Sequence, residues 1–145
     1  MNIDAIENGL VIDHIAAGQG MKLYNLLGLA ELDVPVAIIQ NVVSKKQGKK
    51  DIIKIDAHID VDYDIIGFVD PEATVNFIKD GKLIRKCKFD MPETLVNVIR
   101  CKNPRCITTT EQELPQVFEL RDRENGVYRC KYCEAKASNK EILVN

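Results

Sequence analysis

The first ninety residues alternate between stretches with the hydrophobic pattern of strands and stretches with that of helices. Runs of β-branched apolar residues favour strands, whereas apolar positions that recur at helical spacing favour amphipathic helices. The segment Gly18-Gln19-Gly20 separates the first strand from the first helix. The predicted elements in this part are a strand at residues 10–15, a helix at 21–27, and a second strand at 34–39 that Val42 and Val43 extend.

Turn signals divide the next part of the chain into hairpins. A turn rich in lysine at residues 45–50 leads into the partner of the second strand, and Asp80-Gly81 between two β-rich runs is typical of a tight hairpin. The order β-α-β-β-α-β with an extra strand predicts a ferredoxin-like α+β domain. Its remaining predicted elements are strands at residues 51–56, 73–78 and 82–87, and a short helix at 62–67.

Four of the five cysteines lie in the last third of the chain as two close pairs, Cys101 with Cys106 and Cys130 with Cys133. Two short pairs at that separation can supply four thiolates to a single Zn²⁺ in a tetrahedral site. Four thiolates leave no open position for water or substrate. We therefore predict one zinc ion per chain, with a structural role.

The cysteine-bearing segment is too short to hold a full hydrophobic core, so the metal is expected to supply much of its folding free energy. A chain of 145 residues is long enough for two small domains, and the clustering of the cysteines favours two. We predict a first domain at residues 1–92 and a small, all-β, zinc-ribbon-like domain at residues 93–145.

Two other interpretations of the cysteines compete with zinc. Two disulfides would fit their even number, but the chain begins with neither a basic segment nor a long apolar run, so we expect it in the cytoplasm, where thiols stay reduced. A thioredoxin-like redox centre would use Cys130 and Cys133 alone, yet a partner pair precedes them. Cys87 lies outside the pattern and is interpreted as an ordinary strand residue.

Charge and hydropathy narrow the classes of partner. The formal net charge of −2 argues against a general nucleic-acid-binding protein, although a local basic patch would still be compatible with one. No apolar run is long enough to cross a membrane. We expect a folded protein without nucleic-acid or membrane partners.

Several polar residues interrupt the apolar strands of the first domain. Alternation along a strand predicts that Asp13 and His14 point to opposite faces, and that Lys50 and Lys54 share one face, which Lys86 could join. Clustered ammonium groups repel one another unless an anion lies between them, and a triphosphate is a natural candidate. Because no glycine-rich phosphate loop is present, these residues alone favour lysines that extend into solvent.

Longer motifs change that balance. The run Gly9-Leu-Val-Ile-Asp-His-Ile15, then residues 50–55 and 71–76, then the two cysteine pairs ending in Cys133-Glu134, occur in one order along nearly the whole chain. In this combination the chain resembles the regulatory chain of aspartate carbamoyltransferase. The resemblance implies no catalytic activity of its own. It implies regulatory dimers that bridge trimers of a separate catalytic chain in pyrimidine synthesis, with CTP as inhibitor and ATP as activator at one site.

The same resemblance implies which residues bind the nucleotide. Asp13 and Lys54 would contact the base and ribose, Lys86 the triphosphate, and Ile6 with the backbone of residues 3–5 would wall the base. Asn41 lies where the family uses a polar residue for a second nucleotide. The nucleotide-binding set implied is Ile6, Asp13, His14, Lys50, Lys54 and Lys86.

The cysteine-bearing domain would make the contact with the catalytic chain, through Asn103, Arg121 and Glu134. Basic residues beside the cysteines could offset the −2 charge of a zinc tetrathiolate. The chain departs from the family pattern at two positions. Gly81 stands where a relative has a bulky aromatic beside the ribose, and Arg105 replaces an asparagine in the first cysteine loop.

The main alternative is a zinc-ribbon nucleic-acid-binding or transcription-associated protein. It explains the cysteines equally well but predicts a basic domain with aromatic stacking residues, and only Tyr128 and Tyr132 lie near the cysteines. An enzyme with Asp13 and His14 as an acid–base pair lacks a nucleophile or an open metal site.

Overall fold

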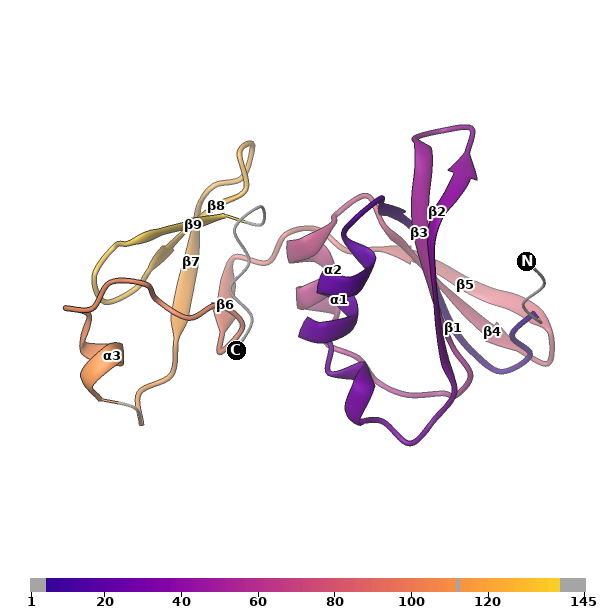
Figure 1. Cartoon of the computed structure of the whole chain (residues 1–145), viewed down its shortest axis with the longest axis horizontal. Coiled ribbons are helices and arrows are strands. Elements are labelled where there is room, and N and C mark those ends of the chain that lie inside the picture. The colour runs from indigo at the N-terminus through magenta and orange to yellow at the C-terminus, as the bar shows by residue number, and fades with distance from the viewer. Residues whose placement is uncertain (1–4, 112, 139–145) are drawn as a thin grey trace. The chain divides into compact units, whose positions relative to one another are not determined.

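The computed structural model describes residues 5–111 and 113–138. The chain divides into two compact units, residues 1–90 and 91–145. Each unit has its own antiparallel sheet, and each is described by itself (Figure 1). None of the helices within the described ranges is long and apolar enough to cross a membrane.

The first unit is built on a five-stranded sheet in the order β2-β3-β1-β4-β5. Helices α1 and α2 cover one face of this sheet and leave the other face without helices (Figure 1). The first four strands and two helices follow the predicted β-α-β-β-α-β order, and β5 adds the extra strand, so the predicted fold class is confirmed. The elements are β1 (Gly9–Ala16), α1 (Gly20–Leu26), the 3₁₀ turn η1 (Leu29–Glu31), β2 (Val36–Ser44), β3 (Gly48–Ile55), α2 (Tyr63–Val69), β4 (Thr74–Lys79) and β5 (Lys82–Lys88).

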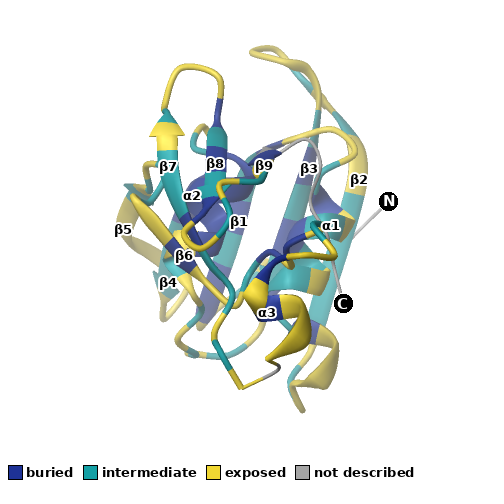
Figure 2. Cartoon of the chain, turned by 90° about the vertical axis from the view of Figure 1, so that its left-hand side faces the viewer, coloured by how far each residue is buried: buried dark blue, intermediate teal, exposed yellow. Residues whose placement is uncertain are grey.

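The core of this unit lies between the sheet and its helices. Every second residue of the central strands points to the helices and is buried, as the pairs Ile12–Ile53 and Leu10–Ile55 show (Figure 2). Each such side chain contributes on the order of 1.5–3 kcal/mol when fully buried. The residues between them point to the opposite side, which we call the open face of the sheet.

The helix boundaries follow from local hydrogen bonding. Helix α2 begins after Asp62, whose carboxylate accepts from the Asp64 backbone N–H at 3.1 Å. Helix α1 begins at Gly20, and a side chain there would overlap the carboxylate of Asp51. The Asp80-Gly81 turn is confirmed, and both residues have the positive φ angles (52° and 77°) that tight hairpins favour.

The sheet contains two β-bulges on either side of β3. One lies in β1 between Ile12 and Ile15, and the other lies in β2 between Ile39 and Val42. The prediction that Asp13 and His14 point to opposite faces was wrong, because the bulge in β1 breaks the alternation and His14 has a φ of 59°. His14 Nδ1 lies 3.0 Å from the Thr74 hydroxyl, which is on the open face with Asp13.

The second unit is a small four-stranded sheet in the order β6-β7-β8-β9 with one short helix, so its mostly β character is confirmed. Leu95, Phe118 and Tyr128 are its largest fully buried side chains. The core is small for an independent unit, as expected for a segment stabilised by metal. The elements are β6 (Thr94–Val96), α3 (Ile107–Thr110), β7 (Val117–Asp122), β8 (Val127–Cys130) and β9 (Lys136–Ser138).

Candidate metal centre and anion site

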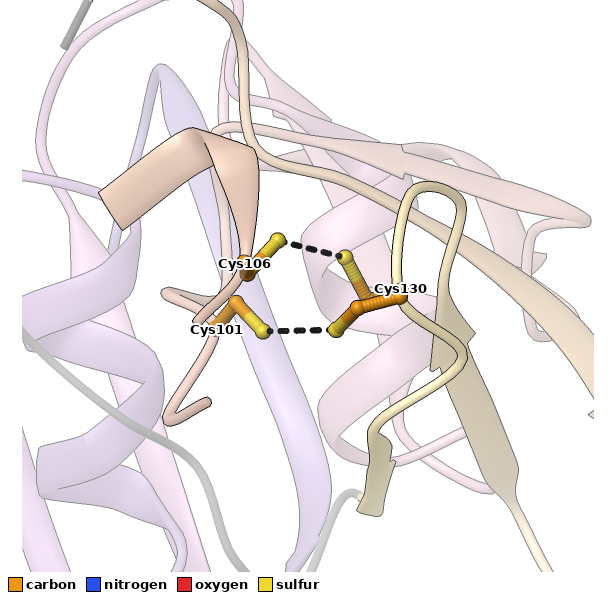
Figure 3. Close-up of side chains that lie close together, drawn as sticks. Cys101, Cys106 and Cys130 are labelled. Carbon is orange, nitrogen blue, oxygen red and sulfur yellow. Dashed lines mark hydrogen bonds between the residues drawn. The ribbon is translucent and has the colours of Figure 1, made fainter. Parts of the chain in front are cut away.

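The two cysteine pairs converge in the second unit, and their four Sγ atoms all lie within 4.8 Å of one another (Figure 3). Cys106 is the residue before α3, and Cys130 is the last residue of β8. All four carry free thiols, with Cys133 half-buried and the others buried. The structure therefore gathers the predicted ligand set at one point.

The spacing of these sulfurs fits a tetrahedral ion. Four thiolates about 2.3 Å from a zinc ion lie about 3.8 Å from one another at the corners of a regular tetrahedron. The Sγ atoms of Cys106 and Cys130 are 3.7 Å apart, and those of Cys101 and Cys133 are 3.4 Å apart. The arrangement thus needs only small side-chain adjustments to hold a metal.

The thiols differ in their tendency to ionise. Burial raises the pKa of Cys101 to about 12 and also raises the pKa of Cys130. Burial opposes ionisation of Cys106 too, but hydrogen bonds from the Thr108 hydroxyl and backbone N–H lower its pKa to about 7. Metal binding requires thiolates and would therefore release protons.

Backbone and guanidinium groups fix the loops that carry the cysteines. The Cys101 N–H donates to the Gln116 side chain at 2.9 Å, and Arg129 donates to the carbonyl of Glu134 at 2.9 Å. Arg129 is one of the basic residues expected to offset the site's charge, and it also holds the second cysteine loop by this hydrogen bond. The cationic residues near the site therefore have a structural explanation.

The three residues expected at an interface lie on this unit in different roles. The guanidinium of Arg121 lies 3.1 Å from the Glu134 carboxylate and 3.3 Å from that of Glu119. Asn103 accepts from the Arg105 N–H at 3.0 Å and so shapes its own loop. The structure brings Arg121 and Glu134 together, while Asn103 belongs to the first cysteine loop.

On the open face of the first unit, a row of directly paired residues crosses the sheet. Lys54 pairs with Val11, Val11 with Asn76, and Asn76 with Lys86. Directly paired residues of antiparallel strands point to the same face. The row therefore carries a lysine at each end of an apolar and amide centre, and within the described residues neither lysine has an ion-pair partner.

Asn76 is a candidate site residue that the sequence interpretation missed. Its Oδ1 atom is buried and has no hydrogen-bond partner among the described residues. A buried polar atom without a partner costs about 1–3 kcal/mol, which suggests that a ligand can supply one. The only signal in the sequence was an amide within the apolar run Thr74-Val-Asn-Phe-Ile78.

Lys50 does not repel its neighbours in the way the clustered lysines suggested, because it has its own counter-ion. Its Nζ lies 2.9 Å from Asp13 Oδ1, and both side chains are largely buried. Burial raises the pKa of Asp13, but the hydrogen bonds from Lys50 and from the His14 backbone N–H outweigh it and leave the pKa below its ordinary value. The pair is therefore ionised at neutral pH.

A pocket of about 380 Å³ lies on the same unit. Of the predicted nucleotide residues, His14 and Lys86 line it, whereas Ile6, Asp13, Lys50 and Lys54 do not. Ile6 is half-buried ahead of β1, and residues 3 and 4 lie outside the described residues. The lining comprises His14, Ala16, Lys46, Gln47, Asp70, Glu72, Thr74, Lys86 and Lys88.

Comparison with known proteins covers both units. Residues 1–90 match the family model for the allosteric domain of the aspartate carbamoyltransferase regulatory chain, and residues 93–143 match the model for its metal-binding domain. A regulatory chain of this name from Clostridium botulinum is 50% identical over 142 residues, which is 98% of this chain and 97% of the relative. Those from Clostridium acetobutylicum and Bifidobacterium longum are 48% and 42% identical, covering 92% and 94% of this chain and 92% and 99% of theirs.

Proposed function

Since the chain belongs to the family of aspartate carbamoyltransferase regulatory chains, we propose that it binds CTP as inhibitor and ATP as activator and transmits their effect to catalytic chains. The resemblance stated from the sequence motifs is thereby confirmed, as is the expectation of a non-catalytic subunit. The proposal includes action in the cytosol and pairing of two regulatory chains. The nucleic-acid-binding alternative is not carried further, because the family models span both units.

The open face supports the nucleotide part of this proposal. Lys54, Asn76 and the side chains of Ile6 and Asp13 would meet the base and ribose, with the unpartnered Asn76 amide oxygen accepting from a base or sugar donor. Lys86, His14 and Lys50 would meet the phosphates, which require several cations. The single observation that carries the assignment is the row of paired residues from Lys54 to Lys86.

The two effectors share their triphosphate, so common phosphate contacts cannot give them opposite effects. An effector shifts an equilibrium only through its different affinities for the two states of the assembly. The base end of the site, near Lys54 and Asn76, must therefore supply the difference between CTP and ATP.

The metal-binding unit would hold one zinc ion and contact the catalytic chain. A four-thiolate site does no chemistry on substrates, but it fixes the two loops that carry Asn103 and Glu134. Arg121, which pairs with Glu134, would lie in the same contact surface. Asn41, placed at the β2 bulge, would belong to a second nucleotide position.

CTP is expected to stabilise the first unit of the zinc-loaded chain, because a ligand that binds only the folded state adds its binding free energy to stability. At a hundred times its Kd the gain is about 2.7 kcal/mol. Thermal denaturation with and without CTP measures it. Lys54→Ala should weaken CTP binding by about tenfold or more.

Lys49→Ala is the matched control, since Lys49 lies on the same strand as Lys54 but on its other face. It should leave CTP affinity unchanged. The absence of any thermal shift at millimolar CTP, or an equal loss in both variants, would contradict the proposed site.

Coexpression with an aspartate carbamoyltransferase catalytic chain is expected to yield one complex that copurifies. Chelation of the metal should release the regulatory chain, because the contact surface depends on the folded metal unit. Size-exclusion chromatography with and without the chelator measures both results. A complex that survives complete removal of metal would show that the contact surface lies elsewhere.

A further inference from the structure

Beside the Lys54–Lys86 row, three separate segments of the first unit converge on the 380 Å³ pocket. The β1 bulge supplies His14, the tip of the β2–β3 hairpin supplies Lys46 and Gln47, and β5 supplies Lys86 and Lys88. Three lysines and a histidine therefore surround one cavity from different sides. The sequence motifs that assigned His14 and Lys86 to the nucleotide say nothing of Lys46, Gln47 or Lys88.

The hairpin tip reaches this pocket because the hairpin is longer than the strand beside it. Strand β1 ends at Ala16, which pairs with Lys50, so residues 45–49 of the hairpin extend past its end (Figure 1). Both bulges flank β3 just before this extension, and bulges bend a strand and increase its twist. The extended tip can thus present Lys46 towards β4 and β5.

Lys88 is held ready on the opposite wall. It pairs with Thr74 and lies two residues after Lys86, so both lysines point to the open face. Its Nζ lies 3.4 Å from the Glu72 carboxylate, but both side chains are exposed, and such pairs are weak. A phosphate group can therefore take Lys88 from Glu72.

The acidic residues of the pocket do not cancel its positive charge. Both oxygens of the Asp70 carboxylate are engaged, one by the Ala16 N–H at 2.7 Å and the other by the Glu72 N–H at 3.0 Å. Lys46, Lys86 and Lys88 then outnumber the one remaining carboxylate, that of Glu72.

Resting on the proposed function, we propose that this pocket holds the outer phosphates of the effector, with Lys46 and Lys88 as the residues that select triphosphates over monophosphates. A monophosphate reaches only the cations next to the row. A triphosphate extends between the hairpin tip and β5, where cations on both walls and the Gln47 amide can donate to it. The hairpin tip thus measures the length of the phosphate chain.

The test is calorimetric titration of the zinc-loaded chain with CMP, CDP and CTP at fixed ionic strength. Lys46→Gln and Lys88→Gln should each lower the ratio of CMP to CTP dissociation constants by about five- to tenfold, with CMP affinity nearly unchanged. Lys45→Gln is the matched control, because it removes the same charge from the same turn but does not line the pocket. It should leave the ratio as in the wild type.

The possible outcomes separate this inference from the function on which it rests. If no cytidine nucleotide binds the wild-type chain, the proposed function itself fails. If CTP binds, the inference is overturned when the Lys46 and Lys88 variants weaken CMP and CTP equally, when they weaken neither, or when Lys45→Gln has the same effect as Lys46→Gln.

Discussion

Replacing Cys106 by serine is expected to remove the metal from the chain and unfold residues 91–138. Cys106 is only 1% exposed, and its sulfur is one of four that meet within 4.8 Å. Structural zinc sites of small domains contribute on the order of 10–16 kcal/mol at neutral pH, far more than a core of this size can replace. Metal analysis should fall from one ion per chain to nearly none.

The same variant should leave the first unit folded, because that unit has a separate sheet and core. Amide NMR signals of residues 91–138 should collapse to unfolded positions while those of β1 and β3 stay dispersed. Cys87→Ser is the matched control, since Cys87 lies outside the cluster and should keep the metal. A Cys106→Ser chain that retains one tightly bound ion would refute the four-thiolate site.

Asp51→Ala is expected to destabilise the first unit more than any other single carboxylate change. The Asp51 side chain is fully buried and accepts three backbone N–H groups at 3.0 Å, those of Gly18, Gly20 and Asn41. Each buried donor left without a partner costs about 1–3 kcal/mol, so the loss should be roughly 3–6 kcal/mol. For a unit of this size that corresponds to a fall in Tm of more than about 12 °C.

Urea denaturation of the zinc-loaded variant measures the loss, and hydrogen exchange locates it. The amides of Gly20 and Asn41 should lose their protection first, because they donate directly to Asp51. Asp56→Ala, an exposed carboxylate just after the same strand, should cost less than about 0.5 kcal/mol. A similar cost for the two substitutions would show that the hydrogen bonds to Asp51 contribute little.

The sequence was sufficient to predict those features that depend on local pattern. The Asp80-Gly81 turn, both helices of the first unit and its strand order follow from residues close together in the chain. Helix α2 runs two residues further than predicted, to Val69, because apolar residues continue its buried face. Strand β3 begins at Gly48, so the lysine-rich turn is shorter than predicted.

Features that depend on pairing between distant strands could not be predicted in this way. The bulge in β1 is visible only once Ile12 and Ile15 are paired with β3, and it reverses the expected orientation of His14. The Lys50–Asp13 ion pair and the exposed amide row through Asn76 likewise arise from register rather than from spacing. Asp51 was counted only as the first residue of a strand, although it links three segments.

The row from Lys54 to Lys86 has a consequence for how this family can change in length. Each of its four members comes from a different strand, and a one-residue insertion within a strand would turn the following side chains to the opposite face. Substitutions can therefore accumulate in these strands, whereas insertions and deletions are confined to the turns. The hairpin tip at residues 45–47 is such a turn, so its length can vary between relatives while the row stays intact.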